Sequence, residues 1–197
     1  MPRPSQANER RKRLLPIVAK AFAELGYRRT TTAKLAKRCK VRENILYRLW
    51  RDKKAMFVAS IEYVYALSAE TWGRLLAEAD DAKPPAERLL KYEAEHHGES
   101  GLQRLVFAGL SETNDPAIRK ALRTMYRRFH RFIGEQISAY RHQRRARHPE
   151  VSLSAWAVIG LGTLASIVGE LDLLKRSERR RFMAGVGQLL MEGRPAT

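Results

Sequence analysis

Residues 30–54 read TTTAKLAKRCKVRENILYRLWRDKK, and this stretch decides the fold. Thr30 and Thr31 are candidate N-caps, because their hydroxyls can accept a hydrogen bond from the first free amides of a helix. We therefore predict a short helix over residues 32–39 with Leu35 on its inward face.

The second half of this stretch predicts a tight turn and another short helix. Lys40 and Val41 form the turn, and the helix that follows covers about residues 42–49. Asp52 can then cap a long helix that begins at Lys53. Two short helices joined by a tight turn are typical of a helix-turn-helix, whose second helix enters the DNA major groove.

The residues before this stretch predict one more helix. Its apolar stripe consists of Leu15, Val18, Ala19, Phe22 and Leu25, spaced as on one face of a helix. Gly26 follows as the expected left-handed C-terminal residue. Proline is tolerated only in the first turn of a helix, so Pro16 places the start near Leu14 or introduces a kink there. Residues 1–13 are then expected to be a mobile basic segment.

The positive charge of the chain is concentrated in this region. The 197 residues carry a formal net charge of +17, and residues 1–55 contain 17 Lys and Arg against four acidic residues, which accounts for +13. Such a local excess points to a polyanionic partner, either nucleic acid or an anionic membrane surface.

The rest of the chain predicts helices and no strands. Helical patterns cover about residues 53–79, 86–97, 102–111, 116–140, 152–174 and 177–191. The fold class is therefore all-α, with an N-terminal three-helix helix-turn-helix module joined to a larger C-terminal helical bundle. The uncharged run over residues 151–169 approaches the length of a membrane span, but its polar residues and glycines favour a core helix or a dimer interface.

Three segments resemble the TetR family of bacterial transcriptional regulators: IVAKAFAELGY from residue 17, TTTAKLAKRCKV from residue 30 and ILYRLWRDKKAMF from residue 45. The resemblance rests on Phe22, Gly26, Tyr27, Thr31, Leu35, Ala36, Val41, Leu46, Tyr47, Trp50 and Lys53. It implies a flexible basic arm over residues 1–9, a helix-turn-helix domain over 10–55, and a helical ligand-sensing and dimerisation domain over 56–197.

The side-chain chemistry of this region predicts which residues contact DNA, and the resemblance adds Tyr47 and Lys53 as the family's phosphate-contacting pair. Base readout is expected from Arg42, Glu43, Asn44 and Arg48 at the start and exposed side of the second short helix, because Arg pairs with guanine, Asn with adenine and Glu with cytosine. An ion pair with a neighbouring cation is the alternative for Glu43, and a partly buried position is the alternative for Tyr47. Phosphate contacts are expected from Thr31, Thr32, Tyr47 and Lys53.

The sequence departs from the family pattern at three positions. Lys40 replaces the usual turn glycine, which costs about 1 kcal/mol if the backbone is left-handed. Arg42 replaces a Ser or Thr cap, and the loss of a cap typically costs about 1 kcal/mol. Asn44 stands where the family often has glycine.

A regulator of this family is expected to act as a cytoplasmic homodimer, dimerising through its last two helices, and to repress transcription in response to a small-molecule effector. Aromatic and sulfur-containing side chains of the C-terminal region are candidates for the effector pocket: Trp72, Tyr92, Phe107, Met125, Tyr126, Phe129 and Trp156. A non-specific basic DNA-binding protein, or a peripheral protein of anionic membranes, is the alternative to a sequence-specific regulator.

No pattern in the sequence predicts catalysis, a cofactor or a metal site. Cys39 is the single cysteine and is expected to be a small buried residue. His96 and His97 are adjacent, so they point about 100° apart on a helix and make a poor metal pair. We therefore expect no enzymatic activity.

Overall fold

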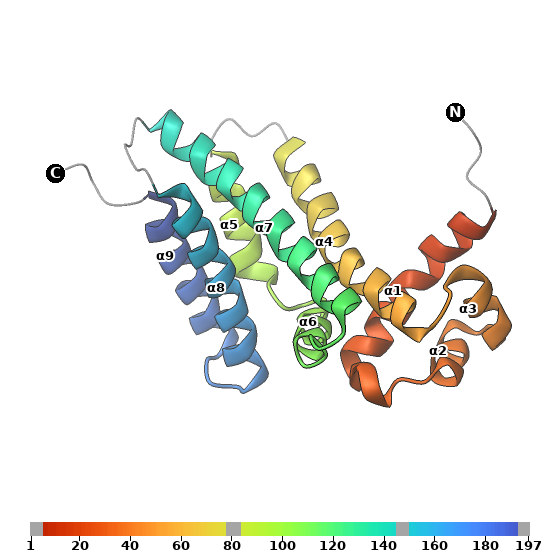
Figure 1. Cartoon of the computed structure of the whole chain (residues 1–197). Coiled ribbons are helices and arrows are strands. Elements are labelled where there is room, and N and C mark those ends of the chain that lie inside the picture. Colours follow the sequence, from red (N-terminus) through yellow and green to blue (C-terminus); the bar gives the residue numbers. More distant parts are fainter. Residues whose placement is uncertain (1–5, 78–83, 145–149, 193–197) are drawn as a thin grey trace. The chain divides into compact units, whose positions relative to one another are not determined.

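The computed structural model describes residues 6–77, 84–144 and 150–192, and within these ranges the chain forms nine α-helices and no strands (Figure 1). The predicted all-α fold class is confirmed. The chain divides into two compact units, one formed by Met1–Leu67 and Gly101–Met125 and the other by Ser68–Ser100 and Tyr126–Thr197.

The first unit contains the predicted helix-turn-helix and additional helical segments. Its elements are α1 (Gln6–Arg29), α2 (Thr32–Cys39), α3 (Glu43–Leu49), the beginning of α4 (Lys53–Ala77), α6 (Gln103–Leu110) and the beginning of α7 (Pro116–Gln143). The second unit contains the remainder of α4 and α7 with α5 (Pro85–His96), α8 (Val151–Glu170) and α9 (Arg176–Glu192).

Aromatic side chains form the centre of the first unit. Phe22 from α1 and Phe57 from α4 meet edge to face with ring centroids 4.9 Å apart, and Tyr27 lies 4.8 Å from Phe57. Edge-to-face contacts of this kind add to the free energy of burying the rings. In the same unit, Gly109 of α6 lets Leu122 approach closely, since a Cβ at Gly109 would lie 3.3 Å from the Leu122 side chain.

The start of α1 differs from the prediction. The helix begins at Gln6 and continues through Pro16, so residues 6–13 are helical and only residues 1–5 of the predicted arm lie outside the described residues. The physical reason is a tertiary contact: Arg11 donates a hydrogen bond to the carbonyl of Leu49, and its guanidinium lies 5.5 Å from the centre of the Trp50 ring. These contacts hold the turn before Pro16 in place and offset the loss of one helical hydrogen bond.

The other end of α1 follows the prediction. Gly26 has φ +73°, the left-handed value that glycine adopts without steric penalty, and it interrupts the regular helix before Tyr27. Thr30 is fully buried and donates its hydroxyl hydrogen to the carbonyl of Gly26.

Helices α5, α7, α8 and α9 share an apolar core in the second unit. Ala86, Ile137, Tyr140, Ala155 and Met191 are its buried members. Buried Arg141 lies beside them, and its guanidinium donates to the carbonyls of Leu190 and Met191 and to Ser154 Oγ at 2.8–2.9 Å. Burial lowers the pKa of Arg141. Its side chain therefore fixes the C-terminal end of α9 against α7 and α8.

The last two helices have boundaries that differ from those predicted. α8 ends at Glu170 rather than near Leu174, because Asp172 adopts φ +52° and the N–H of Leu173 bonds to the carbonyl of Val168 at 2.9 Å. Aspartate tolerates the left-handed conformation that usually selects glycine at a helix C-terminus. α9 begins at Arg176. The carboxylate of Glu178 accepts a hydrogen bond from the N–H of Lys175, the residue just before this helix.

Candidate nucleic-acid interface

The N-terminus of α2 brings two predicted phosphate contacts together. Thr31 caps the helix by accepting the N–H of Lys34 at 3.2 Å, as predicted. The next residue, Thr32, directs its hydroxyl to that of Tyr47 on α3, with the oxygen atoms 3.0 Å apart. Tyr47 is 49% exposed, so its hydroxyl lies at the surface and not in the core. The pair forms a polar site where the first helix of the motif meets the second.

The turn between α2 and α3 is left-handed at Lys40. Its φ and ψ are 53° and 43°, and its N–H bonds to the carbonyl of Lys37 while that of Val41 bonds to Ala36. These two hydrogen bonds satisfy carbonyls at the end of α2 that have no partner within the helix. Lys40 therefore occupies a conformation that disfavours a side chain, as the sequence comparison with the family pattern predicted.

Helix α3 buries one face and exposes the other. The side chains of Leu46 and Leu49 are buried in the interior of the first unit. Arg42 is the N-terminal boundary residue and makes no side-chain capping bond, again as predicted. The four predicted base-reading side chains are exposed, and within the described part of the chain no hydrogen bond or ion pair of these side chains was found: Arg42, Glu43, Asn44 and Arg48.

The alternative for Glu43, an ion pair with a neighbouring cation, is therefore not observed among the described residues. The basic residues nearby bind elsewhere: Arg38 pairs with Glu24, Lys34 Nζ donates to the carbonyl of Arg29 at 2.9 Å, and Arg51 pairs with Asp52 at 3.2 Å. Glu43 keeps its hydrogen-bonding capacity for a partner outside the chain.

Lys53 occupies a different environment from the other predicted phosphate contacts. Its Nζ donates to the carbonyl of Tyr27 at 3.2 Å and lies 4.3 Å from the centre of the Tyr27 ring. The side chain is half-buried. Lys53 thus connects the first turn of α4 to the end of α1.

The first turn of α4 is also held by acidic side chains. Asp52 caps the helix, as predicted, by accepting the N–H of Ala55 at 2.7 Å, and this hydrogen bond is the largest cause that lowers the pKa of Asp52. Asp115 accepts from Lys54 at 2.9 Å and also caps α7 by accepting the N–H of Ala117 at 2.8 Å. The hydrogen bond from Lys54 lowers the pKa of Asp115 more than the backbone donors do.

The ion pair between Arg28 and Glu112 in the first unit was not anticipated from the sequence. Arg28 at the end of α1 donates to Glu112, which lies between α6 and α7, at 2.7 Å. Together with Lys54–Asp115, it joins the end of α1 and the first turn of α4 to the segment between α6 and α7. The Asp115-Pro116 dipeptide is typical of a helix start, and Asp115 does cap α7. No local pattern predicts that Asp115 also pairs with Lys54, which lies 61 residues away.

The predicted effector-pocket residues lie in both units. Met125 is buried and Phe107 half-buried in the first. In the second, Trp72 is buried 5.6 Å from Phe129, Tyr92 stacks on His96, and Tyr126 is half-buried and bonds to Thr163. Burial raises the pKa of Tyr126. Trp156 is 45% exposed and lies 4.6 Å from the ring of His130.

Two other expectations concern metals and membranes. Among the described residues, no group of three or more His, Cys, Asp or Glu side chains could hold a metal ion. Cys39 is buried, and burial raises the pKa of its thiol. α8 is long and apolar enough to cross a membrane by length and composition, with mean hydropathy 1.9, and only 17% of its most apolar window is buried.

Comparison with known proteins finds a family similarity in the first unit. Residues 19–60 match the family model described as bacterial regulatory proteins, tetR family. No curated protein matches the chain significantly.

Several solved structures share the whole fold. A TetR-family transcriptional regulator from Cytophaga hutchinsonii superposes with a TM-score of 0.78 at 14% identity, covering 96% of each chain. The fatty acid degradation regulator FadR from Bacillus halodurans gives 0.75 at 13% identity and covers 98% of each chain. A protein from Saccharomonospora viridis, solved in complex with choline, gives 0.73 at 18% identity and covers 94% of this chain and 96% of its own.

The helix-turn-helix geometry of the first unit, the family model that matches it and the shared all-helical fold agree. Residues 19–60 are therefore similar to the TetR family of bacterial regulatory proteins, and the chain shares its helical fold with solved structures of TetR-family regulators.

Proposed function

We propose that the chain is a sequence-specific transcriptional repressor that binds its operator as a cytoplasmic homodimer and releases it on binding a small-molecule effector. The exposed face of α3 carries this proposal. Its Arg42, Asn44 and Arg48 side chains have donors and acceptors with no partner in the described part of the chain, which is what base readout in the major groove requires. The protein acts by binding, without catalysis.

The residues around α3 have a different proposed role. Thr31, Thr32 and Tyr47 gather hydroxyl groups at the N-terminus of α2, where helix amides favour an anion. We assign phosphate contact to these residues. Lys53 requires a rearrangement to join them, because its Nζ is held by Tyr27.

Exposed apolar side chains on the last two helices and their connection support the homodimer. They are Leu153, Trp156, Leu164, Ile167, Leu171, Leu173 and Leu189, each between 39% and 69% exposed. An apolar surface of this extent marks an interaction site in a protein that functions in water. A second copy related by two-fold symmetry would cover it and present two recognition helices to a near-palindromic operator.

Effector response is proposed from the fold and from its relatives. One structural neighbour was solved in complex with choline, and another is a regulator of fatty acid degradation, so at least one protein of this fold holds a small molecule. Effector binding would favour a dimer arrangement in which the two α3 helices no longer match major grooves separated by about 34 Å. We retain residues 10–55 as the DNA-binding domain and 56–197 as the sensing and dimerisation domain.

The experiment that tests the proposal is selection of genomic fragments by the purified full chain. The enriched fragment and a random duplex of equal length are then compared in a salt titration. Both complexes weaken with salt, because bound cations are released from DNA, but only a specific complex keeps an affinity ratio of about 10³ or more. A ratio near one for every fragment would favour the non-specific alternative. Repression itself is measured by transcription from the selected site.

A further inference from the structure

Glu93 differs from the other acidic side chains of α5 and of the turn that follows it. Glu87 pairs with Arg144 at 2.7 Å, Glu95 pairs with Arg180 at 3.3 Å, and Glu99 pairs with Arg176. In the described ranges, no Lys or Arg pairs with Glu93. In a chain with 38 Lys and Arg, this half-buried carboxylate is left without a permanent positive charge.

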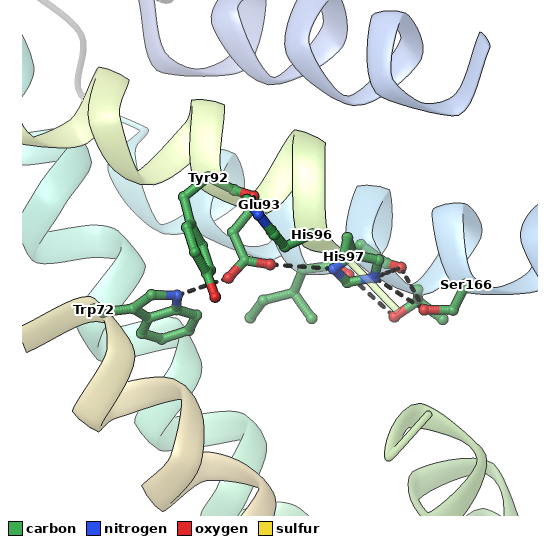
Figure 2. Close-up of polar contacts among 9 residues, drawn as sticks. Trp72, Tyr92, Glu93, His96, His97 and Ser166 are labelled. Atoms are coloured by element: carbon green, nitrogen blue, oxygen red, sulfur yellow. Dashed lines mark hydrogen bonds and ion pairs between the residues drawn. The ribbon is translucent and has the colours of Figure 1, made fainter. Parts of the chain in front are cut away.

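The surroundings of Glu93 are aromatic. Figure 2 shows its carboxylate between Trp72 and His97, and Oε1 accepts the indole N–H of Trp72 at 2.7 Å. Trp72 stacks on Phe132 with ring centroids 4.6 Å apart. The Glu93 side chain remains 30% exposed, so the carboxylate is accessible from solvent.

Among the described residues, the ionisable side chain that pairs with Glu93 is His97, whose ring carries a positive charge only when it is doubly protonated. Its Nε2 lies 2.8 Å from the carbonyl of Gly162 and 2.9 Å from Ser166 Oγ (Figure 2). The Ser166 hydroxyl donates its hydrogen to the same carbonyl, so both groups accept from Nε2, which must carry a proton. Nδ1 lies 3.2 Å from Glu93 Oε2. The ring therefore balances an ionised Glu93 only when both of its nitrogens are protonated.

From this arrangement we infer that Glu93 recognises the effector, and that the effector is an organic cation, an ammonium or guanidinium compound with apolar substituents. The carboxylate provides the charge, and the neighbouring aromatic side chains favour apolar groups over a hydrated metal ion, which requires several oxygen ligands. This inference rests on the proposed effector response and specifies its chemistry.

The arrangement also specifies how binding is transmitted. A cation at Glu93 would take the place of the contact between Glu93 Oε2 and His97 Nδ1, and any proton carried on Nδ1 would be released to solvent. The ring then keeps its Nε2 bonds to α8 but loses its contact with the Glu93 carboxylate. The groups that face this ring are Glu93 from α5 and Gly162 and Ser166 from α8, and Trp72 from α4 faces Glu93. His97 is therefore a positioning residue that connects the effector to α8.

Calorimetric titration of the full chain tests the recognition step. The probes are hexylammonium and benzyltrimethylammonium chloride, with hexan-1-ol and hexanoate as the uncharged and anionic counterparts. We expect at least one cation to bind at least ten-fold more tightly than hexan-1-ol. Glu93→Gln should remove this preference, whereas Glu95→Gln on the same helix should keep it. If both cations bind no better than hexan-1-ol, or bind Glu93→Gln equally well, the inference is wrong.

Two further measurements make the result decisive. Glu93→Asp retains the charge on a shorter side chain and should bind the cation with intermediate affinity, which separates a charge effect from misfolding. Titration in two buffers with different heats of ionisation should show proton release by the parent chain and none by His97→Gln; equal release by both would contradict the role of His97. Cation binding without any effect on DNA binding would contradict the proposed effector response and leave the Glu93 site intact.

Discussion

The hydroxyl oxygens of Thr32 and Tyr47 lie 3.0 Å apart and connect the beginning of α2 to the exposed side of α3. If both hydroxyls contact phosphate, Tyr47→Phe should weaken binding to specific and random duplexes by a similar factor, on the order of ten-fold for one or two lost hydrogen bonds. Fluorescence anisotropy with both duplexes measures this. A loss confined to the specific duplex would instead assign Tyr47 to base readout.

Asn44→Ala provides the complementary test of base readout. Removing an amide that pairs with adenine should relax preference at one base pair and reduce specific affinity by about 1–3 kcal/mol, with little effect on random DNA. Binding to a set of operators substituted at each position measures the preference. Lys37→Ala, on an exposed face of α2, serves as the control, because it should weaken all duplexes equally.

Lys40→Gly should increase the free energy of unfolding by about 1 kcal/mol, because glycine adopts the left-handed conformation of this turn without steric penalty. Urea unfolding measures the change. Lys40→Ala removes the same charge but keeps the steric cost, so it should not be stabilising. Equal stabilisation by both substitutions would show that charge repulsion, and not backbone conformation, is relieved.

Asp115→Asn should destabilise the first unit at pH 7 and much less at acidic pH. The folded-state pKa of Asp115 is lowered, chiefly by the hydrogen bond from Lys54, so its contribution is present above the unfolded pKa of about 3.9 and is lost as pH falls through the folded value. Urea unfolding at pH 7 and at pH 3 measures the difference. If the difference in the free energy of unfolding between the parent chain and Asp115→Asn is as large at pH 3 as at pH 7, the ionised carboxylate does not have this role.

Leu189→Glu should convert the dimer to monomers, because it places a charge in the exposed apolar surface of α9. Analytical ultracentrifugation of the full chain reports the oligomeric state. Leu110→Glu changes a leucine of similar type, 45% exposed on α6, and should leave the dimer intact. A dimer that persists in Leu189→Glu but not in Leu110→Glu would place the interface in the first unit.

Local sequence patterns predicted the segments whose structure is determined locally. The limits of α2, the cap at Thr31, the cap at Asp52 and the left-handed Gly26 follow from neighbouring residues. The start of α1 could not be predicted in this way, because the partners of Arg11 lie at residues 49 and 50.

The polar network around His97 was missed for a similar reason. The sequence shows two adjacent histidines that are unsuitable as a metal pair. Their spacing along the chain does not indicate which distant residues they contact. The partners of His97 on α8 are separated from it by 65 and 69 residues. The absence of a basic partner for Glu93 is likewise a property of three-dimensional packing and not of a motif.

The contact between Arg11 and the Leu49–Trp50 segment has a consequence for the recognition helix. The C-terminal end of α3 is anchored to α1, whereas its N-terminal boundary residue, Arg42, makes no capping bond. Two of the proposed base-reading residues, Glu43 and Asn44, follow directly at that less constrained end. We therefore expect the N-terminal end of α3 to adjust to the major groove more readily than its C-terminal end, which is anchored to α1.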